Sequence, residues 1–214
     1  MGLLSDKDIA YIKDRFKGLD EQVNLALFVD QDGSEYIEKT VQLLKELAAA
    51  SGKLTLEVAD ITKEKERAKK LGIARSPGLL ITTKSNEAHV CYFGIPAGYQ
   101  FAALIDDIID LSSGRTRLSP ITIAKLQQIA KPVEITVFVS PSEELCAGAV
   151  RIAHQFAMEN KNIWASMVDA EQFTELAIHN TVTRVPKVVI NGIISFDEPL
   201  PENEFLEYVM SAAK

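Results

Sequence analysis

The chain alternates between short apolar, β-branched runs and longer segments whose apolar residues recur every three or four positions. The short runs predict strands, and the longer segments predict helices that bury one face. Ile37, Val41 and Leu44 follow helical spacing in the first half of the chain, and Cys146 and Val150 do so in the second. An α/β fold is therefore expected.

The pattern fills each half with the same kinds of element. For the first half it predicts helices over 6–19, 34–50, 63–71 and 99–111, and strands over 23–29, 54–60, a run after Pro77, and 89–93. For the second half it predicts helices over 119–130, 142–159, 170–179 and 201–213, and strands over 134–139, 163–169, 187–190 and 193–196. The last two strands should form a hairpin across Asn191-Gly192, because this dipeptide is a strong hairpin signal.

Three landmarks of the first half recur in the second in the same order. Phe28 and Phe138 are 110 positions apart, and the aspartates that end the next strand, Asp60 and Asp169, are 109 apart. The prolines Pro77 and Pro186 are also 109 apart. One order at nearly one offset indicates an internal repeat.

Each repeat runs β-α-β, then an antiparallel hairpin, then a helix. This order gives a mixed sheet with helices on both faces, which for a unit of about 100 residues is the thioredoxin fold. We therefore expect two tandem thioredoxin-like domains, an N-terminal one over 1–115 and a C-terminal one over 116–214. The small, polar stretch 112–116 marks the boundary between them.

Composition narrows the function classes. The 214 residues are 47% hydrophobic and 25% charged, with a net charge of −7, which argues against nucleic acid as a partner. No apolar stretch approaches the ~20 residues that span a bilayer, and the N-terminus is polar, so we expect a cytoplasmic protein with no membrane contact. The three histidines (His89, His154, His179) and two cysteines (Cys91, Cys146) lack metal-ligand spacing, and no cofactor is expected.

With these features the chain resembles the two-domain protein disulfide oxidoreductases, or glutaredoxin-like proteins, of thermophilic archaea and bacteria. The resemblance covers essentially the whole length, and the most telling stretches are 93–98, 101–103, 138–141 and 149–154. It implies cis peptide bonds before Pro77 and Pro186. It also implies a groove at Ser76-Pro77 and Val185-Pro186 that holds an extended peptide by main-chain pairing.

The family's working parts are two Cys-x-x-Cys motifs, each at the start of a helix that follows a strand. The first motif aligns with Ser34, Glu35, Tyr36 and Ile37, so both thiols are absent. The second aligns with Glu143, Glu144, Leu145 and Cys146, so only the resolving cysteine remains. Dithiol exchange needs two thiols at one site, and no Cys-x-x-Cys occurs in the chain.

The replacing residues resemble helix caps. Around Ser34 the sequence suggests a capping box with Asp32 as the cap and Glu35 as its partner, and a nucleophilic Ser34 lacks a nearby histidine. Before the later helix, the sequence suggests Ser140 as the cap, Pro141 at the first helical position, and Glu143 as an anion that stabilises the helix. An acid–base role for Glu143 is the weaker alternative.

Cys146 is the one disputed residue. It is either a monothiol that forms mixed disulfides or a small core residue, and its repeat counterpart Ile37 on the apolar stripe favours the core. Cys91, in an apolar strand, is also expected to be packed.

We therefore expect a degenerate, redox-inactive relative that binds a protein or peptide or serves as a structural module, rather than an enzyme. Formation of a homodimer is left open. The alternative is a thiol–disulfide oxidoreductase that works through Cys146 alone. A hydrolase or ligand site between the domains is a third option, with no catalytic constellation behind it.

Overall fold

The computed structural model describes residues 2–31 and 33–214. The first half contains α1 (Asp6–Arg15), a 3-10 turn (Phe16–Gly18), β1 (Val23–Val29), α2 (Glu35–Ala48), β2 (Leu54–Asp60), α3 (Lys65–Lys70), β3 (Gly78–Thr83), β4 (His89–Phe93) and α4 (Tyr99–Ser113). The second half contains α5 (Pro120–Leu126), β5 (Val133–Val139), α6 (Glu144–Glu159), β6 (Ile163–Asp169), α7 (Thr174–His179), β7 (Lys187–Ile190), β8 (Ile194–Phe196) and α8 (Glu202–Ala212).

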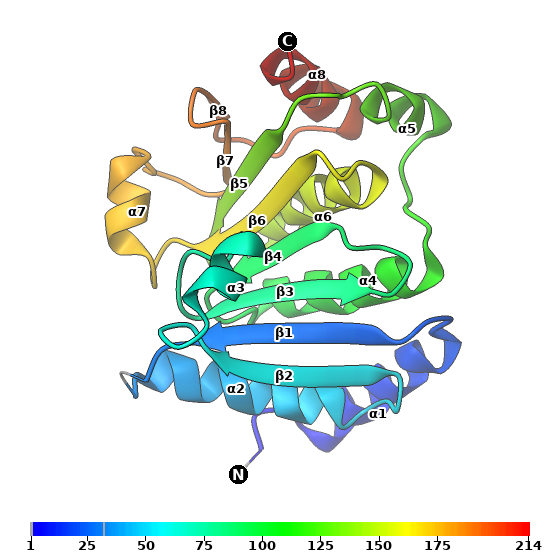
Figure 1. The fold of residues 1–214 in the computed structure, drawn as a ribbon, viewed down its shortest axis with the longest axis vertical. Helices are drawn as coiled ribbons and strands as arrows, with labels where there is room; N and C mark the ends of the chain where they lie inside the picture. Colours follow the sequence, from blue (N-terminus) through cyan, green and yellow to red (C-terminus); the bar gives the residue numbers. More distant parts are fainter. Residues whose placement is uncertain (1, 32) are drawn as a thin grey trace.

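The strands form one mixed sheet in the order β2-β1-β3-β4-β6-β5-β7-β8 (Figure 1). The first four strands have the same order as the last four taken outward from β6, so the two halves share one strand order. The halves are joined by parallel pairing of β4 with β6, from His89↔Trp164 to Phe93↔Val168. The expected α/β fold, a mixed sheet flanked by helices, is confirmed.

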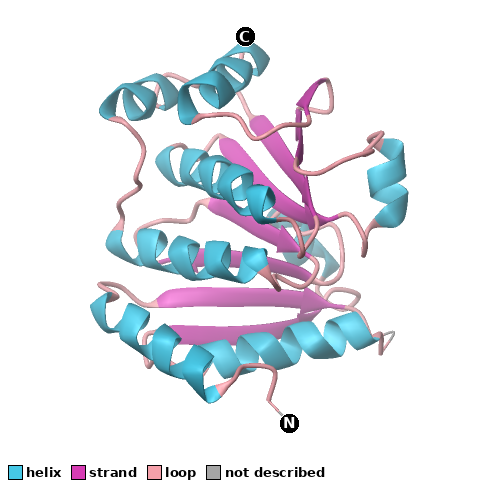
Figure 2. Cartoon of the chain, turned by 180° about the vertical axis from the view of Figure 1, so that it is seen from behind, coloured by secondary structure: helices cyan, strands magenta, loops and turns pink. Residues whose placement is uncertain are grey.

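Helices cover the two faces of the sheet unequally. Seen from behind, the long helices α1, α2, α4 and α6 lie over one face, which we call the back (Figure 2). Of the described helices, the short α3 and α7 lie over the opposite, front face (Figure 1). Among the described helices, none has the length and apolar character needed to span a bilayer.

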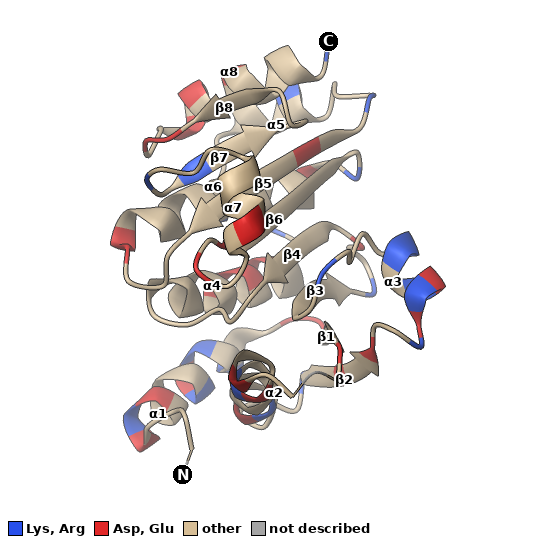
Figure 3. Cartoon of the chain, turned by 90° about the vertical axis from the view of Figure 1, so that its left-hand side faces the viewer, with Lys and Arg blue, Asp and Glu red and all other residues tan. Residues whose placement is uncertain are grey.

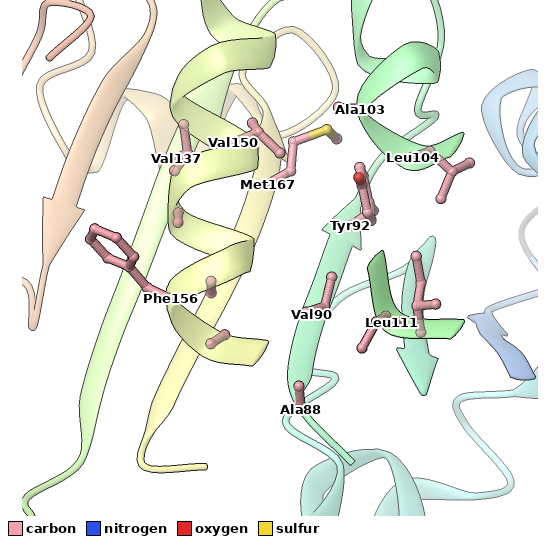
Figure 4. Packing of buried hydrophobic residues seen from close by; sticks show 14 of the residues in the cluster. Ala88, Val90, Tyr92, Ala103, Leu104, Leu111, Val137, Val150, Phe156 and Met167 are labelled. Atoms are coloured by element: carbon pink, nitrogen blue, oxygen red, sulfur yellow. The ribbon is translucent and has the colours of Figure 1, made fainter. Parts of the chain in front are cut away.

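The larger core cluster lies under the back helices and continues across both halves. Tyr92 and Leu104 from the first half and Val150 and Phe156 from the second are fully buried in it (Figure 4). A smaller cluster on the front contains Phe28, Cys91, Phe93, Phe138 and Val168. The expected division at 115/116 falls in the link between α4 and α5 and stays a prediction, since both the sheet and the larger core continue past it.

Most expected boundaries hold to within two residues, but several helices are shorter than expected. The first ends at Arg15 in a 3-10 turn, α5 ends at Leu126, and α7 starts only at Thr174. The hairpin turn at Asn191-Gly192 is confirmed, with φ of 51° and 68°. Positive φ at both positions is what a type I′ turn requires.

Candidate functional site

Both aligned motif positions lie at one edge of the sheet. β1 is parallel to β2 and, through two antiparallel pairings, to β4, which is in turn parallel to β6 and β5. The carboxyl ends of these five strands therefore share one edge, which we call the carboxyl edge. The helices that follow β1 and β5 begin there, and Figure 3 looks onto it.

The first motif position, residues 34–37, forms a helix start without a thiol. Ser34 is the N-cap of α2, and its Oγ accepts a hydrogen bond from the Ile37 N–H at 3.4 Å. Glu35 pairs with Lys39 at 2.6 Å, Tyr36 is 52% exposed, and Ile37 is buried. The expected cap Asp32 lies outside the described residues, and the capping role belongs to Ser34.

Ser76 and Pro77 lie beside this helix start. The Ser76–Pro77 peptide bond is cis, as predicted. The Ser76 Oγ accepts a hydrogen bond from the Asp30 N–H at 2.8 Å, which ties the residue to the loop that leads into α2. No backbone hydrogen bond of Ser76 is found among the described residues.

The second motif position differs from the expected cap. α6 begins at Glu144, and Glu143 is its N-cap, with a side chain that accepts from the Leu145 N–H at 3.4 Å. The predicted Ser140 cap and Pro141 first position were wrong. The Ser140 hydroxyl instead contacts Ser142 Oγ at 2.9 Å and donates to Glu171 at 2.7 Å, which holds the loop before the helix as a separate turn.

Cys146 lies under the helix and not at the surface. Its exposed fraction is 0%, and burial raises the pKa of its thiol to about 11, although the Ser140 backbone N–H acts in the opposite direction. Cys91 is 4% exposed, and burial raises the pKa of its thiol to about 12. Cys146 belongs to the back core and Cys91 to the front core, so the two sulfurs are on opposite sides of the sheet.

The second proline position repeats the first. The Val185–Pro186 bond is also cis, Pro186 is buried, and no backbone hydrogen bond of Val185 is found among the described residues. A pocket of about 320 Å³ adjoins it, lined by Ser140, Val185 and one face of α7. Ile178 of that helix is 72% exposed.

An ionic cluster that sequence reasoning missed links α4 to α6. Asp107, fully buried, accepts hydrogen bonds from Tyr92 Oη and, at 2.6 Å, from His154 Nδ1. Arg151 pairs with Asp107 and with Asp110. Toward the surface, the cluster continues through Arg15, Asp106 and Arg117. The signal in the sequence was a set of charged residues on the core-facing stripes of two apolar helices.

This cluster has the features of a structural element and not of an active centre. Tyr92, Asp107 and His154 are all 0% exposed, so no substrate reaches them. Burial and the charge of Arg151 lower the pKa of His154 to about 3, so its ring is neutral. His154 was expected to be packed or at the surface, and it is packed. In the part of the chain that the structure describes, no three His, Cys, Asp or Glu residues gather as metal ligands would.

Comparison with known proteins agrees with this fold. A family model described as "Thioredoxin domain" matches residues 133–211. A protein disulfide oxidoreductase from Aeropyrum pernix K1 superposes with a TM-score of 0.91 at 28% identity, over 98% of this chain and 93% of that one. The N-terminal domain of alkyl hydroperoxide reductase AhpF from Enterococcus faecalis superposes with a TM-score of 0.89 at 23% identity, over 96% and 99% of the two chains, which shows a shared fold.

Curated relatives match over only part of their own length. The AhpF component of the alkyl hydroperoxide reductase of Staphylococcus aureus is 26% identical over 166 residues, covering 77% of this chain and 30% of the relative. An NADH dehydrogenase from Bacillus subtilis is 21% identical over 169 residues, covering 79% and 31%. This chain therefore spans about a third of the relatives it matches. It has a thioredoxin-type fold and is similar to the Aeropyrum protein disulfide oxidoreductase and, in fold, to the N-terminal domain of AhpF.

Proposed function

We propose that this chain is a redox-inactive thioredoxin-fold module that binds an extended polypeptide segment at its carboxyl edge. The observation that carries the first part is the position of its two sulfurs. Disulfide exchange begins with attack by an accessible thiolate, and both thiols are buried, with raised pKa values and on opposite faces of the sheet.

The alternative, a monothiol enzyme that uses Cys146, requires an exposed thiol with a low pKa. The attacking position at the helix start is instead held by Glu143, whose carboxylate caps the helix. Cys146 is one turn further along and has no exposed surface. These features favour the inactive alternative.

The binding part rests on the two residues before the cis-prolines. The backbone N–H and C=O groups of Ser76 and Val185 have no hydrogen-bond partners among the described residues. Open main-chain groups of this kind can pair with an added strand. The exposed side chains of Tyr36, Leu145 and Ile178 near the same edge provide apolar contacts for such a segment.

The curated relatives are named as a reductase subunit and a dehydrogenase, and both proteins extend well beyond the segment that matches this chain. Their similarity supports a module that acts together with a redox protein. Without a reachable thiol pair, its contribution would be to hold that partner and not to pass electrons to it.

An insulin-reduction assay with dithiothreitol tests the redox part. We expect no turnover above the blank for the natural chain or for Cys146→Ser. Glu143→Cys would restore two thiols three residues apart at a helix start, and it should gain turnover, whereas Glu143→Ser should not. Turnover by the natural chain that is lost in Cys146→Ser would refute the inactive alternative.

Titration with a seven-residue valine–threonine peptide flanked by lysines, followed by amide chemical shifts, tests the binding part. We expect saturable shifts around Ser76 or Val185. The same peptide N-methylated at alternate residues is the control, because it lacks the N–H groups needed for strand pairing. Equal binding of both peptides, or binding of neither, would refute main-chain recognition.

A further inference from the structure

A second site lies on the front face, away from both motif positions. A pocket of about 320 Å³ opens there and is lined by residues of both halves. Arg75 and Phe93 come from the first half, and Glu134, Thr136 and His179 from the second. Figure 1 shows that β5 and β6 carry no helix over this part of the face, between α3 and α7. Its volume is at the small end of the range for ligand pockets.

The floor of the pocket is apolar because three strands are in register beneath it. Phe93 is paired with Val168, and Val168 with Phe138, so the three side chains form one row across β4, β6 and β5. All three are buried. This row gives a ligand an apolar surface with two aromatic rings.

The next row toward the amino ends of these strands is polar. Ser166 is paired with Thr136, and both are half-buried. Neither hydroxyl has a hydrogen-bond partner among the described residues. Two half-buried hydroxyls without partners in a pocket are suited to hold the amide groups of a ligand.

Two oppositely charged side chains that line the pocket have no ion-pair partner among the described residues. The Arg75 guanidinium lies over the Phe93 ring, 5.8 Å from its centroid, and forms no ion pair with any described carboxylate. Its repeat counterpart Arg184, in contrast, pairs with Asp197 at 2.8 Å. Glu134, in the row beyond Thr136, likewise has no cationic partner among the described residues.

The spacing of these charges sets the length of a matching ligand. Glu134 lies four residues along β5 from Phe138, about 13 Å, and Phe93 lies two strands across the sheet from Phe138, about 10 Å, so Phe93 and Glu134 are about 16 Å apart. An ion pair at each end takes about 3 Å of this distance, which leaves about 10 Å between the two charged ends of a ligand. An extended peptide of three residues spans about 10 Å. A single amino acid is too short to reach both groups.

We propose that this pocket binds a short free peptide of about three residues. Its terminal carboxylate meets Arg75, its terminal amine meets Glu134, and an apolar central side chain rests on the floor of Phe93, Val168 and Phe138. The hydroxyls of Thr136 and Ser166 hydrogen-bond its amide groups. This site is independent of the proposed carboxyl-edge function, because none of the edge residues takes part.

Calorimetric titration with three versions of alanyl-phenylalanyl-alanine tests the proposal. The versions have both termini free, the carboxyl end amidated, or the amine acetylated. We expect the free peptide to bind, and each blocked form to bind about tenfold more weakly, since each loses a charged hydrogen bond. Arg75→Gln should abolish the preference for the free carboxylate, and Glu134→Gln the preference for the free amine.

Arg184→Gln is the matched control, because that arginine lies outside the pocket and should leave all three affinities unchanged. Amide shifts on titration should map to Thr136 and Ser166. Absence of binding by the free peptide, equal binding of all three versions, or shifts confined to the carboxyl edge around Val185 would each overturn the proposal. The last outcome would leave the carboxyl-edge function standing, so the two proposals fail separately.

Discussion

The ionic cluster between α4 and α6 gives the sharpest stability prediction. Asp107→Ala removes a fully buried carboxylate. This carboxylate accepts hydrogen bonds from Tyr92 and His154 and forms an ion pair with Arg151. The Arg151 side chain is only 12% exposed, so it cannot recover full hydration when its partner is lost. The substitution therefore leaves Arg151 with Asp110 as its remaining carboxylate partner in the interface between the two halves.

Breaking a buried ion pair by removing one partner costs about 3–5 kcal/mol. Loss of acceptors for a buried tyrosine and a buried histidine acts in the same direction. Asp110, which also pairs with Arg151, offsets part of this cost. We therefore expect Asp107→Ala to lower the free energy of unfolding by about 3–5 kcal/mol.

Urea unfolding followed by circular dichroism measures this change, with the slope against denaturant expected to stay constant. Asp14→Ala is the control, because its ion pair with Lys17 is exposed at 75% and 77%, and no measurable loss is expected. The double variant Asp107→Leu/Arg151→Met should lose less than Asp107→Ala, since it removes both charges of the buried pair and Asp110 keeps Arg117 as a partner at 4.0 Å. A loss below about 1 kcal/mol in Asp107→Ala, where about 3–5 kcal/mol is expected, would refute the reasoning.

Three further predictions concern one buried histidine and two glycines with positive φ. The pKa of His154 is lowered to about 3, so below about pH 6.5 the unfolded chain binds a proton that the native ring does not. The free energy of unfolding should therefore fall by about 2–3 kcal/mol between pH 7 and 4.5. The same pH series on His154→Gln should lack this part of the fall. Gly114→Ala, at φ 62° with open space around it, should cost about 1–2 kcal/mol in thermal unfolding. Gly98→Ala, at φ 58° with its new Cβ 2.2 Å from the Pro141 carbonyl oxygen, should cost about 1–3 kcal/mol more, and equal costs would contradict the assigned contact.

Most of the fold could be predicted from the sequence, because the same landmarks recur in both halves in the same order. Strand order within each half follows from the β-α-β-β-α pattern, and the turn at Asn191-Gly192 follows from local chemistry. The joining of β4 to β6 was not predicted, because pairing between two edge strands depends on how complete units meet. The apolar runs of His89–Phe93 and Ile163–Asp169 are equally compatible with strands at an open edge.

The candidate site was predictable in its chemistry and less so in its geometry. The absence of a Cys-x-x-Cys follows from the sequence, the aligned motif positions follow from the family resemblance, and the burial of Cys146 was inferred from its repeat counterpart Ile37. The cap before α6 was assigned three residues too early. Ser140 fits a capping pattern, but its hydroxyl donates a hydrogen bond to Glu171 across the loop. Sequence spacing does not reveal such a contact 31 positions away.

Alkylation of the native chain tests the central claim most directly. Iodoacetamide is applied at pH 7.5, with and without 6 M guanidinium, and the adducts on Cys91 and Cys146 are located by mass spectrometry. Because both thiols are buried with raised pKa values, we predict no adduct on the native chain and one on each cysteine once it is unfolded. Rapid alkylation of Cys146 in the native chain would contradict a redox-inactive module and support a monothiol enzyme.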